Sequence, residues 1–323
     1  MSTDDAADEF EIIRHYFAPL AANAPGAFNL QDDAATITPN PGFEIVITTD
    51  AIVAGVHFLE DESPRNIAAK LCGSNLSDLA AMGAKPIGFT LACAWPKGTS
   101  LDTIAAFAAG LREWVDGFDF PLLGGDTVST PGPATFSLTA IGEVATGQCL
   151  RRNGARPGDK IFVTGTIGDG VLGLLAAQGK LNVIDADYCA FLEDRFRRPN
   201  PRVSAGQALV GQAHACLDIS DGLVQDLSHM ADASGVSIRL DAASVPLSPA
   251  AQVALNTNPQ LLSTILSGGD DYELLISAAK MPTSLDVLMT EIGTVVAGPA
   301  SVFTQGKDGE EIPLANTGYN HFK

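Results

Sequence analysis

Residues 64–95 read PRNIAAKLCGSNLSDLAAMGAKPIGFTLACAW, and this stretch sets the architecture of the first half of the chain. Pro64 suits the first turn of a helix, the residues after it are rich in Ala and Leu, and Gly83 can supply a left-handed cap at the helix C-terminus. The segment 86–95 follows as a strand. The stretch therefore predicts a long helix that leads directly into a strand.

The segments on either side continue this pattern of strands and helices up to about residue 145. In FEIVITTDA (43–51), Phe43, Ile45 and Ile47 alternate along one face, which predicts a strand that ends on Asp50. Periodicity also predicts helices at 9–20 and 101–115, and strands at 120–127 and 134–144. We therefore expect an α+β sandwich in which helices lie on one sheet.

A second run of strand and helix signals follows the segment ATGQCLRRNGARPGD (145–159), which is rich in small, basic and turn-forming residues. We place the domain boundary near Gln148, which gives domains 1–148 and 149–323. The second domain is expected to be α/β. Its expected strands are 160–165, 215–220, 235–240, 272–277 and 293–298, and its expected helices are 171–179 and 202–213.

The composition limits the classes of partner. Hydrophobic side chains make up 46% of the 323 residues, which is enough for a sizeable core. Acidic residues number 38 against 19 basic ones, and the formal net charge is −19. This balance argues against nucleic acid or an anionic membrane as a partner, because both require an excess of Lys and Arg. An anionic ligand would therefore have to bring cations with it.

The compartment follows from the N-terminus and the cysteines. The opening MSTDDAADEF is acidic and lacks the apolar region of a secretion signal, and the most apolar segments are far shorter than the ~20 residues of a membrane helix. Five widely spaced cysteines without a C-x-x-C pair predict reduced thiols rather than disulfides or zinc ligands. We therefore expect a cytoplasmic protein without a membrane anchor.

Nine aspartates fall in six short motifs rich in Gly, Ser, Thr and Asp, mostly at the ends of expected strands. The motifs are QDDAA, ITTDA, SNLSDLAAMGA, LLGGDT, LDISDGL and SGGDDYEL, and their aspartates are Asp32, Asp33, Asp50, Asp78, Asp126, Asp218, Asp221, Asp270 and Asp271. Carboxylates beside small hydroxyl residues suit Mg²⁺, a hard cation that takes oxygen ligands. A single Asp before Gly is more often a turn residue or a helix cap, so the prediction depends on the motifs occurring together.

A competing phosphate signal lies in the second domain. The chain has no G-x-x-x-x-G-K-[ST] sequence and no protein-kinase motif set. Gly168, Gly170 and Gly173 do form a G-x-G-x-x-G pattern after a strand, as in NAD-binding dehydrogenases. The glycines begin several residues beyond that strand, and they equally suit a tight strand-to-helix turn.

Basic residues are scarce, so their grouping is informative. Arginines gather at 151–156 and 195–202, where a guanidinium could bind triphosphate oxygens or pair with an acid. We favour Arg152 as a phosphate ligand. His57 follows Asp50 closely and could donate to an anionic group of a substrate, or it could be structural.

Taken in order, these motifs resemble those of the thiamine-monophosphate kinase family, a member of the superfamily that includes aminoimidazole ribonucleotide synthetase. The resemblance runs from QDDAA to GYNHF and is carried by TTDAIVAGVHF, NLSDLAAMGA, LLGGDT, RRNGARPGD, VTGTIGDG, RPNPR, LDISDGL and SGGDDYEL. It implies a two-domain fold whose N-terminal domains meet in a homodimer. It also implies direct transfer of the γ-phosphoryl group of ATP to thiamine monophosphate, assisted by several Mg²⁺ ions, to give thiamine diphosphate.

The resemblance also assigns roles to residues of this sequence. The metal ligands would be Asp33, Thr48, Thr49, Asp50, Asp78, Asp126, Asp218 and Asp221, and the catalytic residues among them would be Asp50, Asp126, Asp218 and Asp221. ATP would be contacted by Gly125, Asp126, Arg152 and Ser220, and thiamine monophosphate by His57, Asp270 and Tyr319. The attacking atom would be a phosphate oxygen of the substrate, so neither a protein nucleophile nor a general base is needed.

The sequence departs from the family pattern at three places. Residues 28–35 read FNLQDDAA where glycines usually precede the two aspartates, and Asp270 stands where Glu is usual. Asn316 stands about where a stacking aromatic is common, which leaves Tyr319 and Phe322 as substitutes. The alternatives are another ATP-dependent enzyme of the superfamily with a different acceptor, and a nucleotide-binding protein without turnover.

Overall fold

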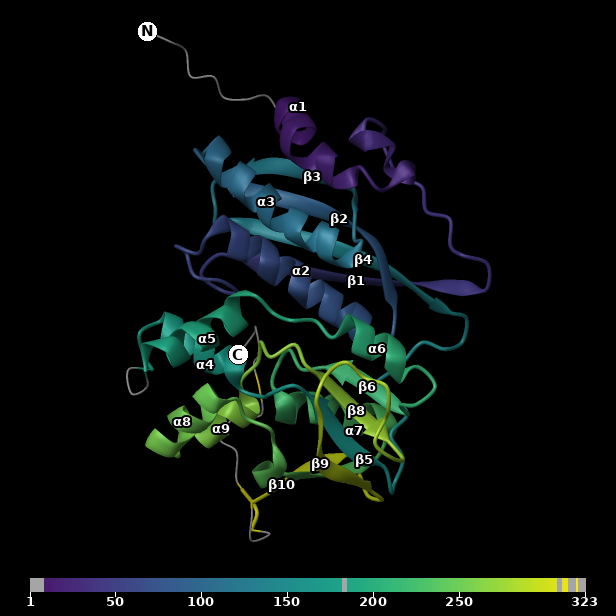
Figure 1. Cartoon of the computed structure of the whole chain (residues 1–323), viewed down its shortest axis with the longest axis vertical. Coiled ribbons are helices and arrows are strands. Elements are labelled where there is room, and N and C mark those ends of the chain that lie inside the picture. The colour runs from purple at the N-terminus through teal and green to yellow at the C-terminus, as the bar shows by residue number, and fades with distance from the viewer. Residues whose placement is uncertain (1–8, 182–184, 307–309, 313–317, 319–323) are drawn as a thin grey trace. The chain divides into compact units, whose positions relative to one another are not determined.

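A computed structural model describes residues 9–181, 185–306, 310–312 and 318 of the chain (Figure 1). The chain divides into two compact units. The first comprises residues 1–79 and 85–146, and the second comprises residues 80–84 and 147–323.

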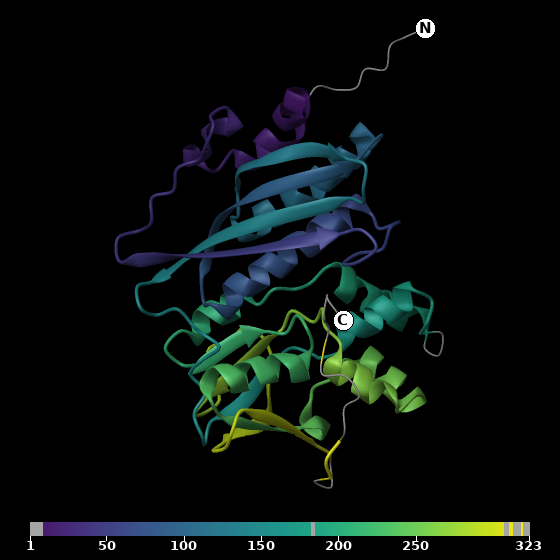
Figure 2. The same ribbon diagram turned by 180° about the vertical axis from the view of Figure 1, so that it is seen from behind.

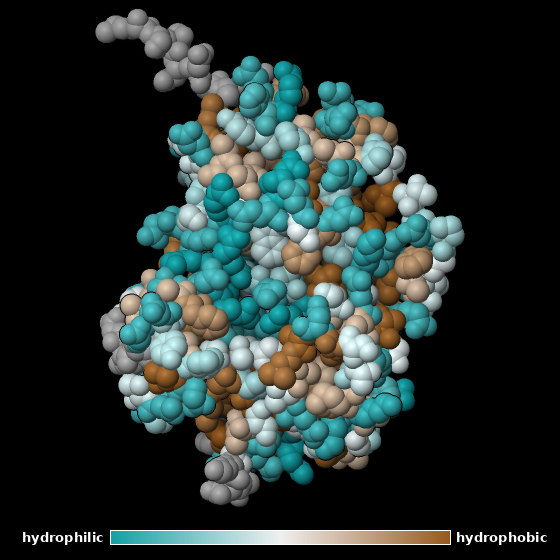
Figure 3. Space-filling view, viewed as in Figure 1, coloured by the Kyte–Doolittle hydropathy of each residue, from teal (hydrophilic) through white to brown (hydrophobic). Residues whose placement is uncertain are grey.

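Among the described residues, no helix combines the length and the apolar character that crossing a membrane requires. Hydrophilic side chains are spread over the face seen in Figure 3 rather than gathered in one patch.

The first unit is built on a four-stranded sheet with the strand order β1-β4-β2-β3. Strands β1 and β2 are both antiparallel to β4, and β2 is parallel to β3. The strands are β1 (Phe43–Val53), β2 (Lys85–Pro96), β3 (Leu122–Thr130) and β4 (Thr135–Ala145). Each predicted strand of this half is present, although β1 continues to Val53 and does not end on Asp50.

Two helices cover one face of this sheet, and the other face is open except where the N-terminal segment packs against Ile141 (Figures 1 and 2). Helix α2 (Pro64–Ala81) begins at its proline, and Gly83 beyond its end has the left-handed φ of +69° that the sequence predicts. Helix α3 (Leu101–Phe118) begins where the Ser100 side chain accepts a hydrogen bond from the Thr103 N–H. Apolar packing between helix and sheet includes the stacked rings of Phe107 and Phe136, whose centroids lie 4.7 Å apart.

The N-terminal segment differs from the continuous helix predicted at 9–20. Helix α1 (Glu9–Ile12) passes into a π-helical turn η1 (Ile13–Phe17) and a 3₁₀ turn η2 (Ala18–Ala21). Pro19 lacks an N–H, so an α-helical hydrogen-bond ladder cannot continue through it. A further 3₁₀ segment, η3 (Pro25–Leu30), follows.

The second unit contains a six-stranded sheet with the order β10-β7-β9-β5-β8-β6, in which only β10 and β7 are parallel. Its strands are β5 (Lys160–Thr164), β6 (Ala215–Asp218), β7 (Ser237–Asp241), β8 (Leu274–Ala278), β9 (Met289–Val296) and β10 (Ser301–Gln305). Its helices are α4 (Asp169–Ala177), α5 (Ala186–Arg197), α6 (Val203–Leu209), α7 (Leu223–Ser234), α8 (Pro249–Thr257) and α9 (Leu261–Ser267), with a 3₁₀ turn η4 (Ala242–Ser244). A buried core joins α7 to the sheet, and a second core joins α4, α5, α8 and α9. The two-domain α+β and α/β architecture expected from the sequence is therefore confirmed.

The predicted helix at 202–213 is shorter than expected, because α6 ends at Leu209 and Gly211 turns the chain with a φ of +77°. Strand β10 and helices α5, α8 and α9 were not predicted. The five cysteines are free thiols, as the sequence predicts.

The G-x-G-x-x-G pattern serves packing in this structure. Strand β5, which precedes it, is antiparallel to both of its neighbours, so the parallel βαβ unit of a dinucleotide-binding fold is absent from the described sheet. The Asp271 carboxylate already accepts hydrogen bonds from the N–H groups of Gly168 and Gly170, at 2.8 and 3.0 Å, where a phosphate would bind. The structure therefore contradicts the dehydrogenase reading.

Gly173 offers a test of this packing role. A Cβ at Gly173 would lie 2.0 Å from the carbonyl oxygen of Leu192, so α4 could not keep its distance from α5. We expect Gly173→Ala to lower the free energy of unfolding by about 3 kcal/mol. Gly117, which has open space around its Cβ position in α3, is the matched control, and Gly117→Ala should raise stability by about 0.5 kcal/mol. Urea unfolding measures both, and equal effects would contradict the packing role.

Candidate active site

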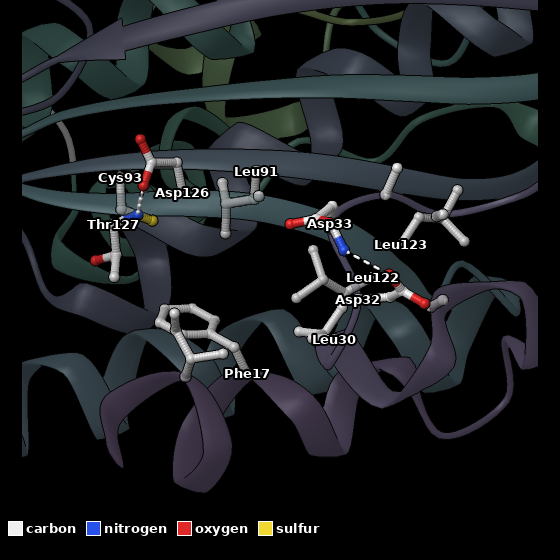
Figure 4. A pocket seen from close by; sticks show the side chains of 16 residues that line it. Phe17, Leu30, Asp32, Asp33, Leu91, Cys93, Leu122, Leu123, Asp126 and Thr127 are labelled. Carbon is white, nitrogen blue, oxygen red and sulfur yellow. Dashed lines mark hydrogen bonds between the residues drawn. The ribbon is translucent and has the colours of Figure 1, made fainter. Parts of the chain in front are cut away.

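A cavity of about 130 Å³ lies between the N-terminal segment and strands β2 and β3 of the first unit (Figure 4). Its lining brings Asp33 together with Gly125 and Asp126, as the sequence predicts. The Asp126 side chain is exposed, accepts a hydrogen bond from the Thr127 N–H at 2.9 Å, and points away from the apolar side chains of Phe17 and Leu30 (Figure 4). The cavity thus has an apolar floor, and the exposed acids Asp32 and Asp33 line it, whereas the Asp126 side chain points out of it from β3.

Cys93 also lines this cavity, but it is unsuited to nucleophilic chemistry. Its side chain is buried, and burial raises the pKa of the thiol well above its usual range, with a smaller contribution from the charge of Asp126. A thiol of this kind stays protonated near neutral pH.

A second group of predicted residues lies where strand β1 meets helix α2. The Thr48 hydroxyl donates to the Asp78 carboxylate at 2.5 Å. The Asp50 backbone N–H donates to the Asn75 side-chain oxygen at 3.2 Å, and the Asn75 amide donates to the Leu71 carbonyl at 2.8 Å. Asn75 is fully buried and thereby fixes the position of the strand that carries Thr48 and Asp50. Asn75 belongs to the SNLSDLAAMGA motif, but its role in holding β1 was not predicted from the sequence.

Strand alternation divides this group between the two faces of the sheet. Thr48 reaches Asp78 of α2, so Thr48 and Asp50 lie on the helix-covered face. Thr49 lies on the open face, where its hydroxyl donates to the Leu138 carbonyl and accepts from the Thr139 hydroxyl, each at 3.1 Å.

The two groups of the first unit are held at opposite edges of the sheet. Across the strands, Asp50 pairs with Leu138, Leu138 with Leu91, and Leu91 with Gly125. Three strand spacings therefore separate the Asp50 backbone from that of Gly125, or roughly 14 Å. The structure does not bring Asp50 and Asp126 together within one copy of this unit.

His57 closes a tight turn at the end of β1. Its Nδ1 accepts a hydrogen bond from the Val53 N–H at 3.1 Å, and its backbone N–H donates to the Val53 carbonyl at 3.0 Å. Because the Val53 N–H is a donor, Nδ1 carries no proton in this arrangement, and the ring proton lies on Nε2. His57 therefore presents Nε2–H as a donor, in keeping with its predicted role toward an anionic substrate.

The predicted residues of the second unit lie on two adjoining loops. Asp218 ends β6, Ser220 and Asp221 follow it, and Asp270 lies in the segment before β8. The Asp270 N–H donates to the Ser220 carbonyl at 2.9 Å, and a Cβ at Gly269 would lie 2.1 Å from that same oxygen. Only glycine at 269 permits this approach, so the structure brings Ser220 and Asp270 into contact.

Asp226 was missed by the sequence analysis and holds the loop that carries Asp221. This buried carboxylate accepts hydrogen bonds from the N–H groups of Asp221 and Gly222, each at 3.2 Å, at the start of α7. Burial raises its pKa to about 7, and the nearby Asp221 charge adds to this, whereas the backbone donors oppose it. Ligand atoms of Asp221, Asp226 and His229 all lie within 4.8 Å of one another. The sequence did contain one signal for this cluster, because Asp226 and His229 are three residues apart and therefore lie on the same face of a helix.

Arg152 lies at the opposite end of strand β6 from Ser220, the other predicted ATP contact of the second unit. Its side chain is exposed, and its carbonyl accepts from Ser234, beside the point where Arg151 bonds to Cys216 at the start of β6. Ser220 follows the other end of that strand. Tyr319, Asn316 and Phe322 lie outside the described residues.

Arg202 of the RPNPR segment and the nearby Arg195 pair with a buried acid. Arg202 makes a bidentate contact with the Glu273 carboxylate, through Nε at 2.6 Å and Nη2 at 2.5 Å, and Arg195 Nη2 donates to it at 3.0 Å. Thr164 at the end of β5 donates its hydroxyl to the same carboxylate at 2.7 Å. Glu273 is fully buried, so these arginines are structural and are not phosphate ligands.

Asp271 yields a prediction about the effect of pH on stability. Burial raises its pKa from 3.8 to about 8, although the Gly168 and Gly170 N–H groups oppose this shift. Between about pH 4 and about pH 8 the folded chain therefore holds a proton that the unfolded chain has lost, so stability falls as pH rises through this window and levels off above it.

The variant Asp271→Asn does not titrate and should lose this decline, which amounts to about 1 kcal/mol per pH unit. Its stability should be lower at acidic pH, because an amide has one acceptor oxygen for two N–H donors. Urea unfolding of both proteins from about pH 5 to about pH 8 compares the slopes. Identical slopes would contradict the assignment.

Comparison with known proteins is consistent with both units. Residues 31–144 match the family "AIR synthase related protein, N-terminal domain", and residues 156–305 match "AIR synthase related protein, C-terminal domain". Thiamine-monophosphate kinase of Caulobacter vibrioides is 44% identical over 312 residues, which cover 93% of this chain and 88% of that protein.

Two solved structures are similar over most of the chain. The crystal structure of thiamine-monophosphate kinase from Stenotrophomonas maltophilia K279a has a TM-score of 0.81 and 38% identity, covering 92% of this chain and 98% of that one. AaThiL complexed with AMPPCP and TMP has a TM-score of 0.78 and 31% identity, covering 90% and 91%. The identity and coverage of these relatives show that the chain belongs to the thiamine-monophosphate kinase family of AIR synthase related proteins.

Proposed function

We propose that this chain transfers the γ-phosphoryl group of ATP directly to the phosphate of thiamine monophosphate, giving thiamine diphosphate. One observation carries the proposal. In a chain of this family, each unit places aspartates beside Ser or Thr hydroxyls at its loops and strand ends. The complex of a relative with AMPPCP and TMP supports the same pair of substrates. Residues 1–148 and 149–323 would be the two functional domains.

The donor set fits Mg²⁺. Every proposed ligand offers oxygen, and none offers sulfur or imidazole, which suits a hard cation that retains water. The ligands would be Asp33, Thr48, Thr49, Asp50, Asp78, Asp126, Asp218 and Asp221. Bound Mg²⁺ would neutralise the charge of the two phosphate-bearing substrates and of the transition state.

The chain's own groups would bind and orient the substrates. Gly125, Arg152 and Ser220 would contact ATP, and the Nε2–H of His57 would donate to the phosphate of thiamine monophosphate. Asp270, and Tyr319 from outside the described residues, would bind its organic part. The substrate phosphate oxygen is the nucleophile and is already ionised near neutral pH, so Asp50, Asp126, Asp218 and Asp221 would act by charge and position rather than as bases.

The proposal is tested by incubating the purified chain with ATP, Mg²⁺ and thiamine monophosphate and measuring thiamine diphosphate. Asp126→Asn should lower turnover by about 10³-fold while leaving the fold intact, because its carboxylate is exposed and Asn keeps an oxygen that can accept from the Thr127 N–H. The matched control is Asp61→Asn, an exposed acid outside the site, which should keep wild-type turnover. Formation of ADP with a different phosphate acceptor, but no thiamine diphosphate, would favour another enzyme of the superfamily.

The family resemblance implies a homodimer. In that dimer, one edge of the first-unit sheet in one chain would lie near the opposite edge of the same sheet in the other chain. The open face exposes Ile47, which is 65% accessible, and Val128, which is 51% accessible, amid Thr, Ser and Ala side chains. Apolar side chains on an uncovered sheet face favour a protein interface. Because Asp50 and Asp126 lie at opposite edges of one sheet, a second copy packed on that face would bring the Asp126 edge of one chain to the Asp50 edge of the other.

Ile47→Asp tests this arrangement, because it places a charge on the open face that the proposed interface would cover. We expect a monomer by light scattering and at least a tenfold loss of turnover with the fold retained. Leu288→Asp is the matched control, since Leu288 is a 73% exposed apolar residue of the second unit, and it should remain dimeric and active. A wild-type chain that is monomeric and fully active would contradict the proposal.

A further inference from the structure

The segment 270–273 alternates between two kinds of position. Asp270 and Tyr272 are half-buried and adopt left-handed backbone conformations, with φ of +70° and +52°. Asp271 and Glu273 are buried. A left-handed conformation costs a residue other than glycine about 1 kcal/mol, so surrounding structure must hold Asp270 and Tyr272 in place.

The buried acids Asp271 and Glu273 hold the segment in this conformation. Asp271 accepts the N–H groups of Gly168 and Gly170 at the start of α4, and Glu273 pairs with Arg195 and Arg202. These contacts fix the backbone of the segment at Asp271 and Glu273, its two buried residues. Asp270 and Tyr272 lie next to these anchored residues and remain half-buried.

The half-buried pair is joined by its own hydrogen bond. The Tyr272 hydroxyl donates to Asp270 Oδ1 at 3.1 Å. The Tyr272 N–H donates to the Ile219 carbonyl at 2.8 Å, and the Asp270 N–H donates to Ser220, so both residues are tied to the loop of Asp218 and Asp221. The phenol therefore limits rotation of a carboxylate whose backbone is already fixed.

We propose that Tyr272 is a positioning residue that orients the Asp270 carboxylate toward an acceptor carrying a positive charge or an amino group. The inference rests on the proposed function only in its choice of acceptor, the cationic thiamine monophosphate. An Asp side chain is short and reaches only groups along its fixed direction, so its orientation sets the affinity for that acceptor. ATP contacts are left to other residues, so the effect of Tyr272 is confined to acceptor binding.

The test is a double-mutant cycle of Tyr272→Phe and Asp270→Asn, with the Michaelis constants of both substrates measured separately. Phe keeps the ring, so the melting temperature and the KM for ATP should be unchanged. The KM for thiamine monophosphate should rise about tenfold in Tyr272→Phe, and more in Asp270→Asn. In the double variant, Tyr272→Phe should add little, because its partner carboxylate is already lost.

Controls separate this inference from the proposed function. Tyr188→Phe removes a phenol elsewhere in the second unit and should leave both constants unchanged. A wild-type chain that does not use thiamine monophosphate would overturn the proposed function, and the cycle would then be run with the acceptor found in the ATP assay. If Tyr272→Phe does not fold, Asp270→Asn tests the premise that this carboxylate binds the acceptor, and an unchanged acceptor KM in that variant would overturn the inference. Equal changes in both KM values, additive effects, or an unchanged acceptor KM would overturn the inference.

Discussion

The organisation of the second unit depends on the buried carboxylate of Glu273. A buried charge is tolerated only when it is paired and hydrogen-bonded, and Glu273 meets this condition through Arg195, Arg202 and Thr164. Burial lowers the pKa of Arg202, but its hydrogen bonds and the charge of Glu273 outweigh this and raise it, so the guanidinium stays charged. One side chain thereby connects the end of β5, helix α5, the start of α6 and the start of β8, and it unites three motifs that are far apart in the sequence.

The same principle explains where phosphate does not bind. Helix N-termini attract anions, yet two of them in this unit are filled by internal carboxylates, α4 by Asp271 and α7 by Asp226. The glycine pattern before α4 therefore serves close packing rather than a dinucleotide. With those two helix ends occupied, an anionic substrate would have to bind elsewhere, and the exposed acids at the loops could bind it only through cations.

Local patterns predicted most elements of the fold, whereas roles that depend on tertiary contacts could not be predicted. The end of the helix at Gly83 follows from the conformational freedom of glycine, and the strand carrying Ile45 and Ile47 follows from the alternation of its apolar residues. Asn75 and Asp226 were missed because their partners are backbone groups whose positions only the folded chain fixes. The separation of Asp50 from Asp126 depends on strand order, which a single sequence does not encode locally, so the motifs indicated a common site without showing that one sheet holds its parts apart.

The acids of this chain fall into two classes, which share the same carboxylate group and differ in burial. Asp169, Asp226, Asp271 and Glu273 are buried and satisfied by backbone N–H groups, hydroxyls or arginines. Asp33, Asp126 and Asp221 lie on loops or edges that water reaches. The buried class fixes the loops on which the second class stands, as Asp226 does for Asp221. Because the scarce arginines are partly used inside the fold, cations would have to balance the charge of the exposed acids, which connects the acidic composition with the metal-assisted phosphoryl transfer proposed above.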